Sequence, residues 1–284
     1  MQKDLNVIIV EDDPYARDFM SLLLRRDWRT RVTGEFGSHA TIELQHALHQ
    51  QAPRVDVLIV DTEVPDDEAW PVKVAQMTRS LPAAQAPVIL YTCTAPDLHV
   101  FGRILNVKGG GYIAKGEILY ALASAVSAAA SGKFVVTPGT YMLAGELELP
   151  EKTVLMDGTL PPTDFTPRER DLTRLGLLFN LAQRDIADDL IVSTDFVAEL
   201  MGQIYQKLGL QEILSGEKAL ETYFKDEKLL ERCREILEQT SINATGKLGR
   251  KAPWMSTLAF HLLTTPSITE FDSGKSPKHP ELPE

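Results

Sequence analysis

Five short apolar runs, each followed by a longer amphipathic stretch, constrain the fold of this chain more than any other feature. The runs are NVIIV (6–10), TRVTGEF (30–36), VDVLIV (55–60), PVILYT (87–92) and GYIA (111–114), and helical patterns lie near 14–26, 38–51, 68–80, 97–107 and 117–131. Apolar runs without strict alternation are typical of strands buried on both faces. Strands that alternate with helices predict an α/β domain over 1–131, a doubly wound five-stranded parallel sheet.

The remainder of the chain changes character after residue 131. Residues 132–163 carry Gly and Pro without a sustained period, so we interpret them as a linker that could hold a short helix at 139–147. Helical patterns return up to about residue 210, then over 215–240 and in APWMSTLAFHLL, which predicts a helical extension over 212–265. Residues 266–284 are rich in Pro, Ser and Glu, and this composition predicts a disordered tail.

The net charge and the cysteine content indicate in which compartment the protein acts and how it interacts with DNA. The formal net charge of the 284 residues is −11, which disfavours nonspecific binding to a polyanion such as DNA. Two cysteines, Cys93 and Cys233, suit a reducing cytosol better than a disulfide framework. The first residues do not form a signal peptide, and no apolar stretch reaches the ~18 residues of a membrane span. We therefore expect a cytoplasmic protein without a membrane partner.

Polar side chains stand where the predicted strands end. Glu11 and Asp12 follow the first strand, Asp61 the third and Lys115 the fifth, and Thr92 closes the fourth. The carboxyl ends of parallel strands share one edge of the sheet, and ligands bind there. Three carboxylates at this edge would repel one another without a cation, and Mg²⁺ suits such an oxygen-rich site. A site of this kind can bind a phosphoryl group while a carboxylate attacks phosphorus.

These motifs resemble the landmarks of the receiver domain of two-component response regulators. The matching stretches are VIIVEDDPYAR, DVLIVDTEVP, PVILYTCT and GGGYIAKGEI. The resemblance implies that Asp61 accepts phosphate from a histidine kinase. It also implies an Mg²⁺ site made by Glu11, Asp12, Asp61 and the backbone carbonyl of Glu63. Thr92 and Lys115 would bind the phosphate, and Tyr112 would be the aromatic residue that changes rotamer on activation.

The alternative is a receiver fold that has lost phosphorylation. The departures from the receiver pattern are small. Glu11 stands where Asp is more frequent, and Asp66, Asp67 and Glu68 follow a Pro where Gly is often found. Other sites are less well supported. The glycines at 109–111 lack the Lys-Ser/Thr of a phosphate-binding loop, and His46 and His49 lack further metal ligands at suitable spacing. No catalytic triad or dyad is evident, so we expect no separate output enzyme.

A helix-turn-helix pattern follows the linker. Thr166, Pro167 and Glu169 predict a helix that begins with a capping box, and Ser193 is placed to cap a later helix that starts at Thr194. The segment resembles the LuxR/NarL-type helix-turn-helix output domain, which we place at 164–211. It is one residue longer than that pattern, somewhere within RLGLLFNLAQ. Its apolar residues occupy the positions of the family core: Ile186, Ala187, Leu190, Val192, Val197, Ile204 and Leu208.

The polar residues of this segment do not suit an ordinary DNA-reading helix. Residues 164–210 hold five Arg/Lys and eight Asp/Glu, although basic contacts to phosphate supply much of the affinity for DNA. The candidate face for DNA or a protein partner comprises Arg184, Thr194, Asp195, Ala198, Glu199, Leu200, Gln203 and Lys207. Acids can accept from cytosine, so specific reading of bases stays possible.

Two functions follow from these patterns. The first is a response regulator that is phosphorylated on Asp61 and controls transcription through its LuxR-type domain, with a homodimer as one possible active form. The second is a phosphorylation-switched protein-interaction module whose helix-turn-helix no longer binds DNA. In that case an exposed Leu200–Met201 pair could contact a partner, unless both side chains are buried in the domain core. The charge count disfavours DNA binding, and the order of the domains favours it.

Overall fold

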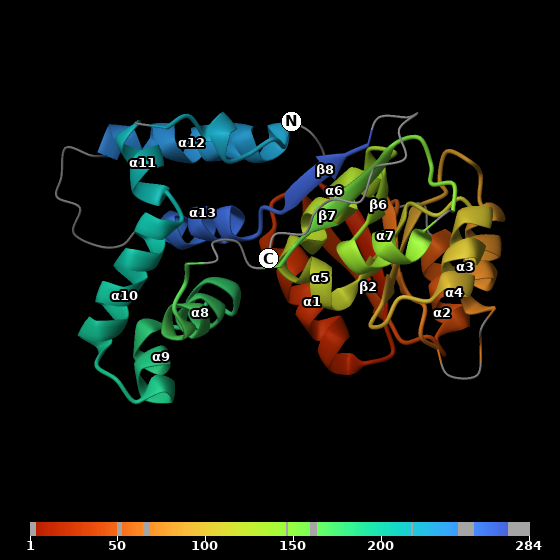
Figure 1. Cartoon of the computed structure of the whole chain (residues 1–284), viewed down its shortest axis with the longest axis horizontal. Coiled ribbons are helices and arrows are strands. Elements are labelled where there is room, and N and C mark those ends of the chain that lie inside the picture. Colours follow the sequence, from red (N-terminus) through yellow and green to blue (C-terminus); the bar gives the residue numbers. More distant parts are fainter. Residues whose placement is uncertain are drawn as a thin grey trace. The chain divides into compact units, whose positions relative to one another are not determined.

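The computed structural model describes residues 4–49, 53–64, 67, 69–145, 147–159, 164–216, 218–243 and 253–271. Contacts divide the chain into two compact units. The first contains residues 3–159 together with the segment from residue 266, and the second contains residues 160–265. Figure 1 shows that the first unit is built on a sheet and the second on helices. The chain thus leaves the sheet unit after residue 159 and returns to it at residue 266.

The sheet of the first unit contains the five predicted strands and three more. Its strands run in the order β2-β1-β3-β4-β5-β6-β7-β8. The predicted set comprises β1 (Leu5–Val10), β2 (Thr30–Phe36), β3 (Val57–Asp61), β4 (Val88–Cys93) and β5 (Gly111–Ala114). These five strands pair in parallel, which confirms the doubly wound α/β class.

Helices cover both faces of the sheet. Against one face pack α1 (Pro14–Arg26) and α6 (Leu122–Ala130), whose apolar side chains join Val7, Ile9 and Ile59 in one buried cluster. The other face carries α2 (Thr41–His49), α3 (Trp70–Arg79), α4 (Leu98–Asn106) and α7 (Pro138–Ala144) around a second cluster. Burial on both faces explains why these strands are apolar without alternation.

The segment 132–163 differs from the predicted linker. It adds β6 (Phe134–Val136) and β7 (Thr153–Asp157) to the sheet, both in parallel, with α7 between them. The helix that the sequence left open at 139–147 is thus present, but it belongs to a β-α-β extension of the sheet. β6 was missed because FVV is only three residues long and is followed, after Thr137, by Pro138 and Gly139, which favour a loop on local grounds.

The segment from residue 266 also differs from the predicted disordered tail. Residues Ser267–Glu270 form β8, which pairs antiparallel with β7. The ring of Phe271 stacks on that of Tyr141, with 5.0 Å between ring centroids. A short polar strand whose partner lies more than 100 residues earlier carries no local signal. The rest of the predicted tail, residues 272–284, lies outside the described residues.

The second unit begins with the predicted helix-turn-helix. It comprises α8 (Pro167–Thr173), a π-helical turn η2 (Arg174–Leu178), α9 (Gln183–Leu190) and α10 (Thr194–Lys207). The capping box is formed, because Thr166 Oγ1 accepts from Glu169 N at 3.3 Å and Glu169 Oε2 accepts from Thr166 N at 2.7 Å. Ser193 caps α10 as predicted. A π-helical turn holds an extra residue, so η2 accounts for the added length within RLGLLFNLAQ.

The rest of the second unit is helical, but the pattern over 215–240 is interrupted. α11 (Leu210–Ser215) ends at Gly216, whose φ of 74° stops the helix, and α12 (Glu227–Asn243) begins after a short 3₁₀ turn, η3 (Leu220–Thr222). α13 (Pro253–Leu263) follows and packs against η2. The basic cluster GKLGRK at 246–251 lies outside the described residues. No helix in the described part of the chain is long and apolar enough to span a bilayer.

Candidate phosphoacceptor site

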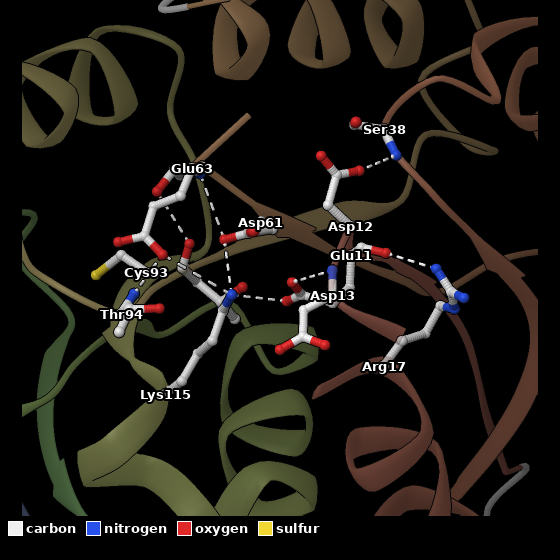
Figure 2. A network of polar contacts seen from close by, with 12 residues as sticks. Glu11, Asp12, Asp13, Arg17, Ser38, Asp61, Glu63, Cys93, Thr94 and Lys115 are labelled. Carbon is white, nitrogen blue, oxygen red and sulfur yellow. Dashed lines mark hydrogen bonds and ion pairs between the residues drawn. The ribbon is translucent and has the colours of Figure 1, made fainter. Parts of the chain in front are cut away.

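The structure brings the predicted polar residues of three strands together at the carboxyl edge of the sheet. Glu11 directly follows β1, and Asp61 ends the neighbouring strand β3, where it pairs with Thr92 of β4. Lys115 begins the one-turn helix α5 (Lys115–Ile118) directly after β5. The side chains of Glu11 and Asp61 are buried. Figure 2 shows that both carboxylates are directed toward the side-chain nitrogen of Lys115.

Lys115 joins the two buried carboxylates. Its Nζ lies 2.8 Å from Glu11 Oε2 and 3.0 Å from Asp61 Oδ1. Burial raises the pKa of Glu11 to about 7; the hydrogen bond from Lys115 opposes this rise and the charge of Asp61 adds to it. Burial would lower the pKa of Lys115, but the hydrogen bond with Glu11 and the charge of Asp61 outweigh it and raise that pKa. The lysine is therefore a fixed cation beside the predicted phosphoacceptor.

Asp12 does not join this group. Its Oδ1 accepts the backbone N–H of Ser38 at 2.7 Å, and Figure 2 shows its carboxylate directed away from Lys115. Burial would raise the pKa of Asp12, but its hydrogen bonds with Ser38 outweigh this and lower the pKa. Within the described residues no three His, Cys, Asp or Glu side chains gather in a way that could hold a metal ion. The predicted set of three carboxylates is thus divided, with two at Lys115 and one at Ser38.

The Glu63 side chain has a role that the sequence did not indicate. Its carboxylate accepts the backbone N–H groups of Thr94 at 2.8 Å and Ala95 at 2.9 Å. Burial would raise the pKa of Glu63, but these hydrogen bonds outweigh it, lower the pKa and keep the carboxylate ionised. The receiver resemblance implied a role only for the backbone carbonyl of Glu63, as a ligand of Mg²⁺. Its carboxylate instead joins the loop after β3 to the loop after β4, which are the two loops beside Asp61.

The structure places Thr92 near the end of β4, paired with Asp61, and Tyr112 in β5. Among the described residues the buried Thr92 hydroxyl has no hydrogen-bond partner, although buried hydroxyls are normally bonded. The Tyr112 ring is buried beside Phe101, and its hydroxyl accepts the backbone N–H of Asp97 at 3.1 Å. An unsatisfied hydroxyl one strand away from Asp61 is suited to bind a phosphoryl oxygen.

One further contact at this edge was missed by the sequence analysis. Arg17, on α1, donates from Nη1 to the backbone oxygen of Glu11 at 2.8 Å, and so fixes the end of β1 (Figure 2). Arg17 lies six residues after Glu11, a spacing that has no meaning until α1 folds back beside the strand. Sequence alone therefore offered no signal for it.

The candidate face of the helix-turn-helix is acidic in the structure. Asp195, Glu199 and Gln203 are exposed on α10, as are Thr194 at its start and Arg184 on α9, whereas Ala198 and Leu200 are half-buried. Lys207 is paired, because its Nζ lies 2.8 Å from the buried Glu169 carboxylate and 3.1 Å from the backbone oxygen of Asp164. Met201 is buried, so the Leu200–Met201 pair is not an exposed partner surface.

Comparison with known proteins found similar chains among response regulators. No protein-family model matches the sequence. The Fimbriae Z protein of Salmonella typhimurium is 23% identical over 235 residues, which are 80% of this chain and 100% of that protein. Among solved structures, the two-component response regulator RcsB in complex with DNA is 21% identical, covers 73% of this chain and 93% of its own, and has a TM-score of 0.43.

The response regulator ChrA of a heme-sensing two-component system is also 21% identical. It covers 73% of this chain and 92% of its own, with a TM-score of 0.38. The strand order and the parallel pairing define the fold independently of these comparisons. The chain is similar to response regulators, with the receiver fold in its first unit and a helix-turn-helix in its second.

Proposed function

We propose that this chain is a response regulator that accepts a phosphoryl group on Asp61 and controls transcription through its helix-turn-helix unit. The observation that carries the proposal is the grouping of Asp61, Glu11 and Lys115, together with the unsatisfied hydroxyl of Thr92 on the adjoining strand. These groups supply a nucleophilic carboxylate, a cation and a hydrogen-bond donor around one point. A histidine kinase is the donor that this chemistry and the relatives suggest.

The oxygen ligands at this edge suit Mg²⁺ in part. Glu11 and Asp61 present buried carboxylates that share one cation, Lys115. Burial raises the pKa of Glu11, and the charge of Asp61 adds to this rise. Together with the backbone carbonyl of Glu63 they would hold the ion, and Asp12 would join them only by turning away from Ser38. When bound, Mg²⁺ would neutralise phosphoryl oxygens during transfer.

The protein's own groups would act around the phosphoryl group. Asp61 would attack phosphorus through a carboxylate oxygen while the bond from phosphorus to the imidazole nitrogen of the kinase histidine breaks, and the imidazole would leave. The Lys115 ammonium would exchange part of its contact with Asp61 for a phosphoryl oxygen. Thr92 would donate its free hydroxyl to another oxygen. Asp61 would then carry more negative charge at the edge where Glu63 joins two loops. Such a charge can bias a two-state equilibrium of those loops and of Tyr112.

A second function, binding of a protein through the helix-turn-helix unit, is favoured by one observation. Asp195 and Glu199 are exposed on α10, while its one lysine is paired with Glu169. An acidic helix must be brought against the negative charge of DNA, which opposes binding. The helix-turn-helix formed by α9 and α10 favours transcription control, because this motif commonly reads DNA. We therefore keep transcription control as the main proposal.

Binding to genomic DNA fragments at about 50 mM and at physiological salt would separate these two functions. The protein would be measured alone and with Mg²⁺ and beryllofluoride, and Asp61→Asn would serve as the unresponsive control. Transcription control is supported if particular fragments are enriched and if their binding falls steeply as salt rises. Beryllofluoride should change this binding only when Asp61 is present. If no fragment binds in either state, the transcription proposal fails, and a partner of the α10 face becomes the better explanation.

A further inference from the structure

The point where the chain leaves the sheet unit is hydrogen-bonded close to Lys115. The N–H of Gly158 donates to the backbone oxygen of Glu117 at 2.8 Å. Gly158 directly follows β7, and the first unit ends one residue later. Glu117 is the third residue of α5, which begins at Lys115. One residue, Gly116, therefore separates the lysine of the phosphoacceptor site from the contact that holds the exit of the chain.

This contact requires a glycine at position 158. A Cβ at Gly158 would lie 2.2 Å from the backbone oxygen of Ile118 and 2.8 Å from the Cβ of Ala121. A separation of 2.2 Å from a backbone atom cannot be relieved by turning a side chain. Any larger residue would therefore push the end of β7 away from α5.

α5 is held by its neighbours in the β-α-β extension and is distinct from the following helix. The Glu117 carboxylate accepts the backbone N–H of Gly139, at the start of α7, through both of its oxygens at 2.9 Å. The Thr137 hydroxyl accepts the N–H of Ala114, which directly precedes Lys115, at 3.0 Å. α5 ends at Leu119, whose φ of 22° is unusual for a residue other than glycine. A one-turn helix bounded in this way can shift as a short segment.

The return of the chain lies beside its exit. Asp157, at the end of β7, pairs with Ser267, at the start of β8. The second unit is thus inserted between two paired strands of the sheet, and both of its connections lie at the same end of β7. A shift of this end would therefore act on both connections together.

We propose that Glu117 and Gly158 are positioning residues that couple the phosphoacceptor site to the helix-turn-helix unit. Phosphorylation changes the partners of Lys115, α5 follows its first residue, and the Gly158–Glu117 hydrogen bond transmits the shift to both connections. This inference rests on the proposed phosphorylation of Asp61. It assigns a function to the strands β6, β7 and β8, which the receiver resemblance did not predict.

The test is hydrogen exchange on the full chain with and without Mg²⁺ and beryllofluoride, followed by mass spectrometry of peptides. Loading is expected to change exchange by at least about threefold in the peptide over 153–159 and in α8 of the second unit. Gly158→Ala is expected to keep phosphorylation of Asp61 and to lose most of the response in α8. Gly102→Ala is the matched control, because a Cβ there meets nothing within 4 Å, and it is expected to respond like the native chain.

The outcomes distinguish this inference from the proposed function. If a small phosphoryl donor does not modify Asp61 in the native chain, the proposed function and the coupling both fail. If Asp61 is modified but 153–159 does not respond in the native chain, or if Gly158→Ala transmits the full response, the coupling alone is wrong. Glu117→Ala provides a second variant in case Gly158→Ala does not fold, and it is expected to weaken the α8 response because α5 loses its anchor on α7.

Discussion

The ammonium of Lys115 lies 3.0 Å from Asp61, so the predicted phosphate-binding cation already pairs with the predicted phosphoacceptor. The same ammonium contacts Glu11 at 2.8 Å. Two carboxylates and one lysine at a buried edge make stability and phosphoryl chemistry depend on the same three side chains. Substitutions of Lys115 and of Glu11 are therefore expected to change the free energy of unfolding in opposite directions.

Lys115→Met is expected to destabilise the sheet unit at neutral pH, because it leaves two neighbouring buried carboxylates without their cation. The loss should be on the order of 2–4 kcal/mol and should shrink in acid as Glu11 takes up a proton. Urea unfolding at pH 7.5 and pH 5 would measure it. Lys133→Met, which removes an exposed pair with Glu270, is the control and should cost less than about 1 kcal/mol. Equal losses for the two variants would contradict the account.

Glu11→Gln is expected to have the opposite effect. Burial raises the pKa of Glu11 from 4.5 to about 7 in the folded chain, so the folded state binds this proton more tightly than the unfolded state. The unfolding free energy therefore falls as pH rises from about 4.5 to about 7. Glu11→Gln removes this fall and should stabilise the protein above pH 7 by roughly 1–3 kcal/mol, with no gain below pH 4.5.

Glu35→Gln is a comparison variant for which we expect the opposite dependence of stability on pH. Burial would raise the pKa of Glu35, but hydrogen bonds from Arg25 and Ser21 outweigh it and lower the pKa. The stabilisation that Glu35 supplies is therefore present above its unfolded pKa and is lost in acid. Glu35→Gln should destabilise the protein at neutral pH and should converge with the native chain in acid. If the change in unfolding free energy depended on pH in the same way for both Gln variants, the predicted destabilisation by the buried Glu11 carboxylate would be wrong.

Lys207→Gln is expected to reduce stability without changing the salt dependence of DNA binding. Lys207 pairs with Glu169, whose side chain is 2% exposed, and the pair holds the start of α8 against the end of α10. Removing the lysine leaves a buried carboxylate with one partner fewer, at a cost of about 1–3 kcal/mol. Thermal unfolding and DNA titration at several salt concentrations would separate the two roles. A salt slope that becomes shallower by about one unit would instead make Lys207 a phosphate contact.

Asp195→Lys combined with Glu199→Lys is expected to strengthen DNA binding. Both carboxylates are exposed on α10, so the change replaces repulsion with possible contacts to phosphate. The salt slope should steepen by about one unit for each new contact. Glu231→Lys, on the exposed side of α12, is the control for net charge. If the control strengthens binding as much, α10 does not face DNA.

The predicted part of the fold is the part with strong local patterns. The strands that lead to Glu11, Asp61, Thr92 and Lys115 are apolar runs of four to six residues, and parallel pairing places their ends together. The capping box at Thr166 and the cap at Ser193 were likewise readable, because each depends on residues three positions apart.

The unpredicted part depends on contacts between distant segments. β8 exists because β7 offers an edge more than 100 residues earlier in the chain, and its own sequence, SITE, is polar and exposed. The contact between Gly158 and Glu117 and the capture of Lys207 by Glu169 similarly join segments about 40 residues apart. Such pairs are set by packing, so sequence patterns do not reveal them. The pairing of Lys207 with Glu169 bears most on function, because Lys207 was predicted to lie on the DNA-binding or partner face.

Phosphorylation of Asp61 is the most direct test of the central claim. The full chain would be incubated with acetyl phosphate and Mg²⁺, and intact mass and peptide mapping would locate any phosphoryl group. The account predicts a single acid-stable, base-labile phosphoryl group on Asp61, lost in Asp61→Asn and strongly reduced when Mg²⁺ is chelated. An unmodified native chain, or modification that persists in Asp61→Asn, would contradict it.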